Sequence, residues 1–174
     1  VMPLITMRLV SEERRNRTLT LLFTAPINMT QIVLGKYLAA LLFVLIIVLM
    51  LVLMPLSLLV GAQLDWGLFA AGVLGLTLLL ASFTAIGLFM STLSQSPTVA
   101  AIATFGVLLF LWILEWAAEG NAARDLINYL SITSHYQAFV KGVFDSADAW
   151  YYLLLIVAFL VLSIRRLDAD RLGS

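Results

Sequence analysis

The residue types that carry out chemistry are scarce in this chain, and most of them gather in one short polar block. The 174-residue sequence has no cysteine and a single histidine, His135. The densest cluster of charge is residues 11–18, which read SEERRNRT. Without cysteine the chain has no disulfides, thiolate metal sites or thiol nucleophiles. A lone histidine without nearby Cys or Asp partners indicates a surface polar residue, not a metal ligand, and it lacks the acidic residue that serine–histidine catalysis needs to orient it.

Two enzyme activities can be compared with the polar motifs: intramembrane proteolysis and nucleotide hydrolysis. Glu12, Glu13 and Arg17 fit E-E-x-x-x-R, the first motif of intramembrane CAAX-type proteases. Those enzymes need further histidines inside membrane helices to hold a metal or activate water, and His135 is expected outside the spans, so this activity stays a remote alternative. A phosphate-binding loop is missing from the sequence, because Gly35 and Lys36 are followed by Tyr37 and lack the earlier glycine. We therefore expect no catalysis by this chain alone.

The composition places the chain in a membrane. Hydrophobic residues make up 63% and charged residues 11%, with a mean hydropathy of +1.07. Soluble domains are about half apolar and about a quarter charged, and a fold of this size could not bury the excess in an aqueous core. Ten basic and ten acidic residues cancel, which leaves no electrostatic footprint for nucleic acid. We predict an all-α, polytopic membrane helical bundle and exclude a soluble enzyme or a disordered chain.

Apolar runs of about 20 residues can cross the hydrocarbon core, and they divide this single transmembrane domain, residues 1–174, into predicted parts. The second predicted span is rich in small residues, which predicts a packed inner helix. Ser96 and Pro97 form a helix start before the third span, and the fourth is short. The parts are a cytoplasmic region at 1–36, spans at about 37–60, 68–90, 97–116 and 149–164, and an outer loop at 117–148.

Basic residues flank the two ends of the chain, whereas the loop at 117–148 holds only Arg124 and Lys141 among four acids. Positive charge marks the cytoplasmic side, and four spans return the chain to its starting side, so both ends are expected in the cytoplasm. The outer loop contains one apolar helical stripe. It predicts a helix lying in the outer interface, with a re-entrant element as the alternative. The stripe consists of Tyr136, Phe139, Val140, Val143 and Phe144.

The polar block has the pattern of a short helix. Ser11 can act as N-cap, Glu12 and Glu13 then occupy the first turn, and the arginines follow. Leu19, Leu22 and Phe23 would form its apolar edge. Two interpretations remain open: a solvated cap that only fixes the topology, or a docking element for a cytoplasmic partner.

The stretch from Pro3 to Lys36 resembles the permease subunits of type-2 ABC exporters, and more narrowly those of gliding-motility and nitrous-oxide operons. The matching features are Pro3, Thr6-Met7-Arg8, Glu12-Glu13, Thr18-Leu19, Leu22, Pro26 and Ile32 to Lys36. A weaker likeness covers His135, Gly142, Asp145 and Tyr151-Tyr152. Such permeases usually have six spans, and the Pro-x-x-Thr-Met-Arg element closes the second. The resemblance therefore predicts that two spans belong before Val1.

The resemblance implies how the chain would work. In these permeases the polar segment after the second span is the coupling helix, here residues 10–23, and it sits in a groove of a separate ATP-binding subunit. The chain itself would bind no cofactor, since ATP belongs to that partner. A second permease chain and membrane lipid complete the expected partners in the cytoplasmic membrane. The expected contacts with the ATP-binding subunit are Glu12, Glu13, Arg14, Arg15, Thr18, Leu19 and Leu22.

The cargo is less constrained. No predicted span holds a clear buried charge, which favours an amphipathic or lipid-like substrate over an inorganic ion. A non-transporting membrane anchor or assembly subunit is the remaining alternative, because composition cannot separate it from a permease.

Overall fold

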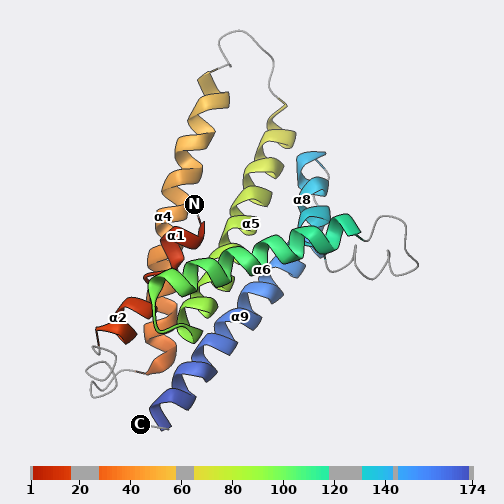
Figure 1. Cartoon of the computed structure of the whole chain (residues 1–174). Helices are drawn as coiled ribbons and strands as arrows, with labels where there is room; N and C mark the ends of the chain where they lie inside the picture. The colour runs from red at the N-terminus through yellow and green to blue at the C-terminus, as the bar shows by residue number, and fades with distance from the viewer. Residues whose placement is uncertain (1, 17–27, 58–64, 118–130, 143–144, 173–174) are drawn as a thin grey trace.

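The computed structural model describes residues 2–16, 28–57, 65–117, 131–142 and 145–172, and all regular structure within these ranges is α-helical. This confirms the all-α prediction. Figure 1 shows long helices crossing one another, with the short N-terminal helices against their flank. The helices are α1 (Met2–Thr6), α2 (Ser11–Arg15), α4 (Met29–Ser57), α5 (Trp66–Leu93), α6 (Pro97–Ala117), α8 (Ile132–Val140) and α9 (Ser146–Leu172).

Helix α5 forms the centre of the bundle and contacts α1, α4, α6, α8 and α9. Its small residues explain this position, because they let neighbouring backbones approach closely in lipid. At Gly75, a Cβ atom would lie 2.5 Å from the Cβ of Phe139 on α8. Ala81, Ala85 and Leu88 continue the buried face of α5. The predicted packed inner helix is thus confirmed.

Helix α4 packs with one face on α5 and turns a long apolar face outward. Val33, Tyr37 and Ala40 are buried in this packing, and the Tyr37 hydroxyl donates to the Ala81 carbonyl oxygen over 3.2 Å. The opposite face exposes residues such as Leu42 and Met50, which suits contact with lipid chains. Toward the end of α4 and the start of α5 the two helices diverge (Figure 1). An apolar cavity of about 610 Å³ lies there, between α4, α5 and α8.

Two helices extend beyond the predicted spans to which they correspond. Helix α4 begins at Met29, not at residue 37, so Lys36 lies within it. Helix α9 runs from Ser146 to Leu172, although the predicted fourth span was only 149–164. Charged residues end an apolar run without ending a helix, and an Arg166–Asp170 ion pair at 3.6 Å supports the extension.

Three described helices are long and apolar enough to cross a membrane: Met29–Pro55, Trp66–Leu93 and Ser146–Arg171. Helix α6 covers the third predicted span, and its apolar described part, Pro97–Ile113, is shorter. In Figure 1, α6 is steeply inclined to α4 and α5, and the N-terminal part of α6 crosses α5.

The predicted outer-loop helix corresponds to α8, but it ends at Val140. Val143 and Phe144 of the expected stripe lie outside the described residues. Phe139 is fully buried against α5, and the Tyr152 hydroxyl of α9 donates to the Ile132 carbonyl oxygen over 2.6 Å. Gly142, with φ of 77°, reverses the chain beyond α8. Helix α8 therefore packs against α5 and α9, and its position relative to the membrane, interfacial or re-entrant, stays a prediction.

Candidate functional site

The segment with the densest predicted charge is anchored to the membrane helices by the turn that precedes it. Residues 7–13, called the elbow below, comprise the turn after α1 and the first part of α2. Thr6, Val10 and Ser11 are buried against the bundle. Thr6 rests on Gly87 of α5, where a Cβ atom would lie 2.7 Å from the Cβ of Thr6. Close approach of the end of α1, just ahead of the elbow, to α5 therefore requires glycine at this position.

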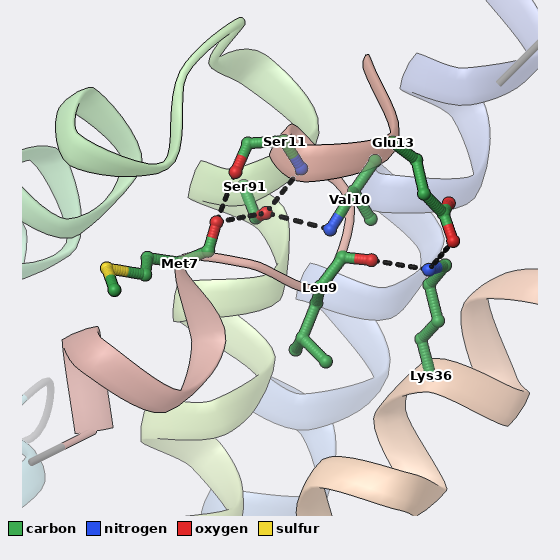
Figure 2. Close-up of polar contacts among 7 residues, drawn as sticks. All are labelled: Met7, Leu9, Val10, Ser11, Glu13, Lys36 and Ser91. Atoms are coloured by element: carbon green, nitrogen blue, oxygen red, sulfur yellow. Dashed lines mark hydrogen bonds and ion pairs between the residues drawn. The ribbon is translucent and has the colours of Figure 1, made fainter. Parts of the chain in front are cut away.

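One hydroxyl group on α5 organises the backbone of the elbow (Figure 2). The Ser91 oxygen accepts hydrogen bonds from the backbone nitrogens of Val10 at 3.1 Å and Ser11 at 3.0 Å. It donates to the Met7 carbonyl oxygen at 3.2 Å, and the Ser11 hydroxyl donates to the same carbonyl. A turn leaves the regular helical ladder, so these buried backbone groups need other partners. Ser91 supplies them.

The elbow is also held from the α4 side. The Lys36 ammonium donates to the Leu9 carbonyl oxygen and to Glu13, whose Oε1 lies 2.6 Å from Nζ. Both side chains are partly exposed, at 19% for Lys36 and 29% for Glu13. Figure 2 shows the two attachments on different sides of the turn, with Ser91 at one side and Lys36 at the other. Helices α5 and α4 therefore both form hydrogen bonds to the elbow.

The predicted partner-contact residues separate into distinct groups. Glu12 is exposed and lines a small cavity of about 260 Å³ together with Arg8, Asn16 and Thr98. Glu13 is turned toward Lys36, inside the elbow. Arg14 and Arg15 belong to α2, but their side chains lie outside the described residues. Thr18, Leu19 and Leu22 also lie outside the described residues. Of the predicted set, Glu12 is the described side chain that faces outward.

Two residues that hold the elbow, Ser91 on α5 and Lys36 on α4, were not anticipated from the sequence. Ser91 has no local signal, because it is one small residue among many in an apolar run. The sequence places Lys36 only at the end of the predicted cytoplasmic region 1–36, whereas it lies within α4 and its side chain reaches back to the elbow. Ser11 also behaves differently from the expected N-cap, since its hydroxyl bonds backward to Met7. Only the docking of residues 7–13 between α4 and α5 makes these roles visible.

A second polar cluster joins α8 to α9. His135 Nδ1 lies 2.5 Å from Asp148 Oδ1, and the histidine ring stacks on Tyr151 with centroids 4.3 Å apart. The expectation that His135 is a lone surface residue without an acidic partner was wrong. Both side chains are largely buried, at 14% and 13% exposure. The fold returns α9 past α8, which brings Asp148 to the histidine.

The geometry separates the residues that a protease would need to combine. Helix α2, which carries Glu12 and Glu13, and helix α8, which carries His135, lie at opposite ends of the bundle (Figure 1). Within the described ranges, no group of three or more His, Asp and Glu side chains could hold a metal ion. The glutamate pair and the histidine therefore do not form one catalytic site.

Comparison with known proteins adds the remaining observation. A family model described as "ABC-2 family transporter protein" matches residues 3–172. No curated protein and no solved structure matches the chain. The family match begins just ahead of the elbow and ends at the last turn of α9, so it includes both polar clusters.

Proposed function

Since the chain belongs to the ABC-2 transporter family, we propose that it is the permease of an ATP-driven exporter whose ATP-hydrolysing subunit docks on α2. Family membership makes the chain a multi-pass membrane component of an ABC transporter, working with an ATP-binding partner. Export, docking at α2 and the transfer of movement through the elbow are the proposed steps. The sequence also resembles the permeases of gliding-motility and nitrous-oxide operons, and we propose that the chain belongs to that branch of the family.

The observation that carries the proposal is the way α2 is mounted. Glu12 points outward, while the residues around it are fixed by hydrogen bonds to α5 and α4. A solvated cap that only sets topology would need no such attachments. A docking helix needs them, because force applied to a loosely tethered segment would be lost in its own motion. Exposed charge can select and orient a partner.

The proposed cycle uses the helices as levers. Nucleotide-driven closure of two ATP-binding subunits would draw two copies of α2 together, one on each of two permease chains. Each α2 would pull on the helices that hold its elbow, and the bundle would rock between inward-facing and outward-facing arrangements. The chain would contribute position and movement, while the partner would contribute nucleotide chemistry.

Charge supports a cytoplasmic position for this machinery. The C-terminal end of α9 carries Arg165, Arg166 and Arg171 and lies at the same end of the bundle as α2 (Figure 1). Basic residues concentrate on the cytoplasmic side of membrane proteins. We therefore place both ends of the described chain in the cytoplasm, with the α8 end of the bundle outward, in the cytoplasmic membrane of the cell.

A charge reversal at Glu12 tests the docking. Glu12→Lys keeps the elbow intact because Glu12 is exposed, whereas reversing Glu13 would break its contact with Lys36. Asp168→Lys is the matched control, since Asp168 is an exposed acidic residue at the same end of the bundle but on α9 instead of α2. The ATP-binding subunit is titrated onto each permease in nanodiscs. We expect Glu12→Lys to weaken binding about tenfold, as loss of a charged interface contact does, and Asp168→Lys to leave it unchanged.

Two outcomes would contradict the proposal. Undiminished binding to Glu12→Lys would show that the subunit docks elsewhere, and α2 would then be a topology cap. A subunit that binds normally, but whose ATP hydrolysis is unaffected by the permease, would support the non-transporting anchor.

A further inference from the structure

We propose that Ser91 is the positioning residue through which movement of α2 reaches the membrane helices, with Lys36 as a second, more compliant attachment. The inference rests on the proposed function and names the route that force takes inside this chain. It concerns residues of α5 and α4, not the contact surface with the ATP-binding subunit.

The bonding of Ser91 makes a stiff joint. A single hydroxyl holds three backbone groups of one turn, from Met7, Val10 and Ser11. The side chains of Ser91, Val10 and Ser11 are buried, so water cannot easily replace the bonds. Leaving buried N–H and C=O groups without partners is unfavourable, and the turn is therefore held in one geometry.

Other hydroxyls of the same helix show that this arrangement is specific. Ser82 and Thr92 are also fully buried, but each donates to a carbonyl oxygen of α5 itself, at Leu79 and Phe89. Such bonds satisfy the hydroxyl locally and tie α5 to nothing else. The hydrogen bonds of Ser91 run instead to residues about eighty positions earlier in the chain.

The joint lies where α5 can pass movement onward. Phe89, two residues before Ser91, packs against Phe159 of α9 with ring centroids 5.7 Å apart. Helix α5 has its most extensive contacts with α9 and also packs on α4 and α6. A displacement of the elbow that drags Ser91 must therefore shift the central helix against all of these neighbours, since close-packed interiors transmit strain.

Lys36 provides a different kind of attachment. Its long side chain spans from α4 to the Leu9 carbonyl oxygen and to Glu13, and it is partly open to solvent. Part-exposed ion pairs are weak and adjustable, because water competes with them and the side chains can move. We assign Lys36 the task of keeping α4 in register with the elbow while Ser91 carries the displacement.

The experiment uses the assembled transporter and a fluorescent reporter on the outer part of α5. The chain has no cysteine, so Trp66→Cys provides a unique labelling position in it, and Trp66 is 60% exposed. The permease is labelled with an environment-sensitive fluorophore, then combined with its ATP-binding subunit in nanodiscs of phosphatidylethanolamine and phosphatidylglycerol. Fluorescence is compared without nucleotide and after trapping with Mg-ATP and vanadate.

The expected result distinguishes a residue that transmits movement from one that only stabilises the fold. Ser91→Ala should bind the ATP-binding subunit normally but reduce the nucleotide-dependent fluorescence change about fivefold or more, because all three hydrogen bonds of Ser91 to the elbow are gone. Ser82→Ala is the matched control and should keep the full change. Lys36→Met should reduce the change less. The double variant Ser91→Ala/Lys36→Met should depart from additivity, since both residues hold one segment.

The outcomes that overturn the inference are distinct from failure of the proposed function. A full fluorescence change in Ser91→Ala, or an equal loss in Ser82→Ala, would remove Ser91 from the route. Additive effects of the Ser91 and Lys36 variants would show that they do not act through a common elbow. If Ser91→Ala does not assemble, Lys36→Met is tested alone. An undiminished nucleotide-dependent fluorescence change in Lys36→Met would then overturn the claim that the elbow is attached through both α5 and α4. By contrast, two results would overturn the proposed function itself. One is a label whose fluorescence does not respond to nucleotide in the complex with Ser91 and Lys36 intact. The other is a failure of the ATP-binding subunit to bind that permease.

Discussion

The Ser91 hydroxyl lies 3.0 Å from the backbone nitrogen of Ser11, although 80 positions separate the two residues. This contact fastens the charged N-terminal helix to the central helix of the bundle. It also explains why Glu12 can project outward from a fixed base. The predictions below test the packing that holds the elbow, the packing of α8, and the orientation of the whole chain.

Replacing Gly87 should displace the elbow. In Gly87→Ala the new methyl group would meet Thr6, whose Cβ is 2.7 Å away, and overpacking of this kind costs about 1–3 kcal/mol. Gly72→Ala is the control on the same helix, because its Cβ would have nothing within 4 Å. We expect thermal denaturation in detergent to begin earlier for Gly87→Ala. An unchanged midpoint would mean that Thr6 does not pack on Gly87 in the membrane.

Removing the Phe139 ring should detach α8 from the bundle. Phe139 is fully buried over Gly75, and truncating a buried phenylalanine costs about 3–5 kcal/mol. Hydrogen exchange of the α8 peptide should accelerate strongly in Phe139→Ala. Val140→Ala serves as the comparison, since Val140 is half exposed and should change exchange little. Slow exchange in both variants would contradict the packed position of α8.

Removing the charge of Asp148 should loosen the junction of α8 and α9. Asp148→Asn weakens the contact with His135, and loss of a largely buried, charge-assisted hydrogen bond costs about 1.5–3 kcal/mol. Asp145→Asn removes a neighbouring exposed carboxylate and should cost less. Denaturant unfolding of the two variants measures the difference. Equal stability would show that the pair contributes nothing to the junction.

Single cysteines can establish the orientation. Glu12→Cys, Asp168→Cys and Asp145→Cys each place a thiol at an exposed position of a chain without other cysteines. With both ends of the chain in the cytoplasm, a membrane-impermeant maleimide applied to intact cells should label only the Asp145→Cys variant. Permeabilised cells should show labelling of all three. Labelling of Glu12→Cys from outside would place α2 on the wrong side for any cytoplasmic ATP-binding subunit.

Much of the fold could be predicted because its cause is local. Long apolar runs indicated the helices that became α4, α5 and α9, and the small residues of 68–90 indicated the central packed helix. The helices extend beyond the predicted spans, from Met29 in α4 and past Ile164 in α9, because the chain stays helical where it is no longer continuously apolar. A helix continues through polar residues when neighbouring helices hold it, and hydropathy alone does not contain that information.

The candidate site was predictable only in part. The charge of residues 11–18 singled out α2 as the candidate docking segment, and Glu12 is exposed there. Its contact with a partner stays a prediction. The same pattern gave Glu12 and Glu13 one role, yet Glu13 turns inward to Lys36. His135 looked isolated because Asp148 is 13 residues away, and only the return of α9 past α8 brings them together.

Amino-acid order by itself determined that this chain forms membrane helices and carries its densest charge near the N-terminus, because apolar length and charge act along the chain. Tertiary structure decided which polar groups meet: Ser91 with the elbow, Lys36 with Glu13, and His135 with Asp148. Those pairings depend on how separate helices pack, and packing is set by surfaces that come together only when the whole bundle forms.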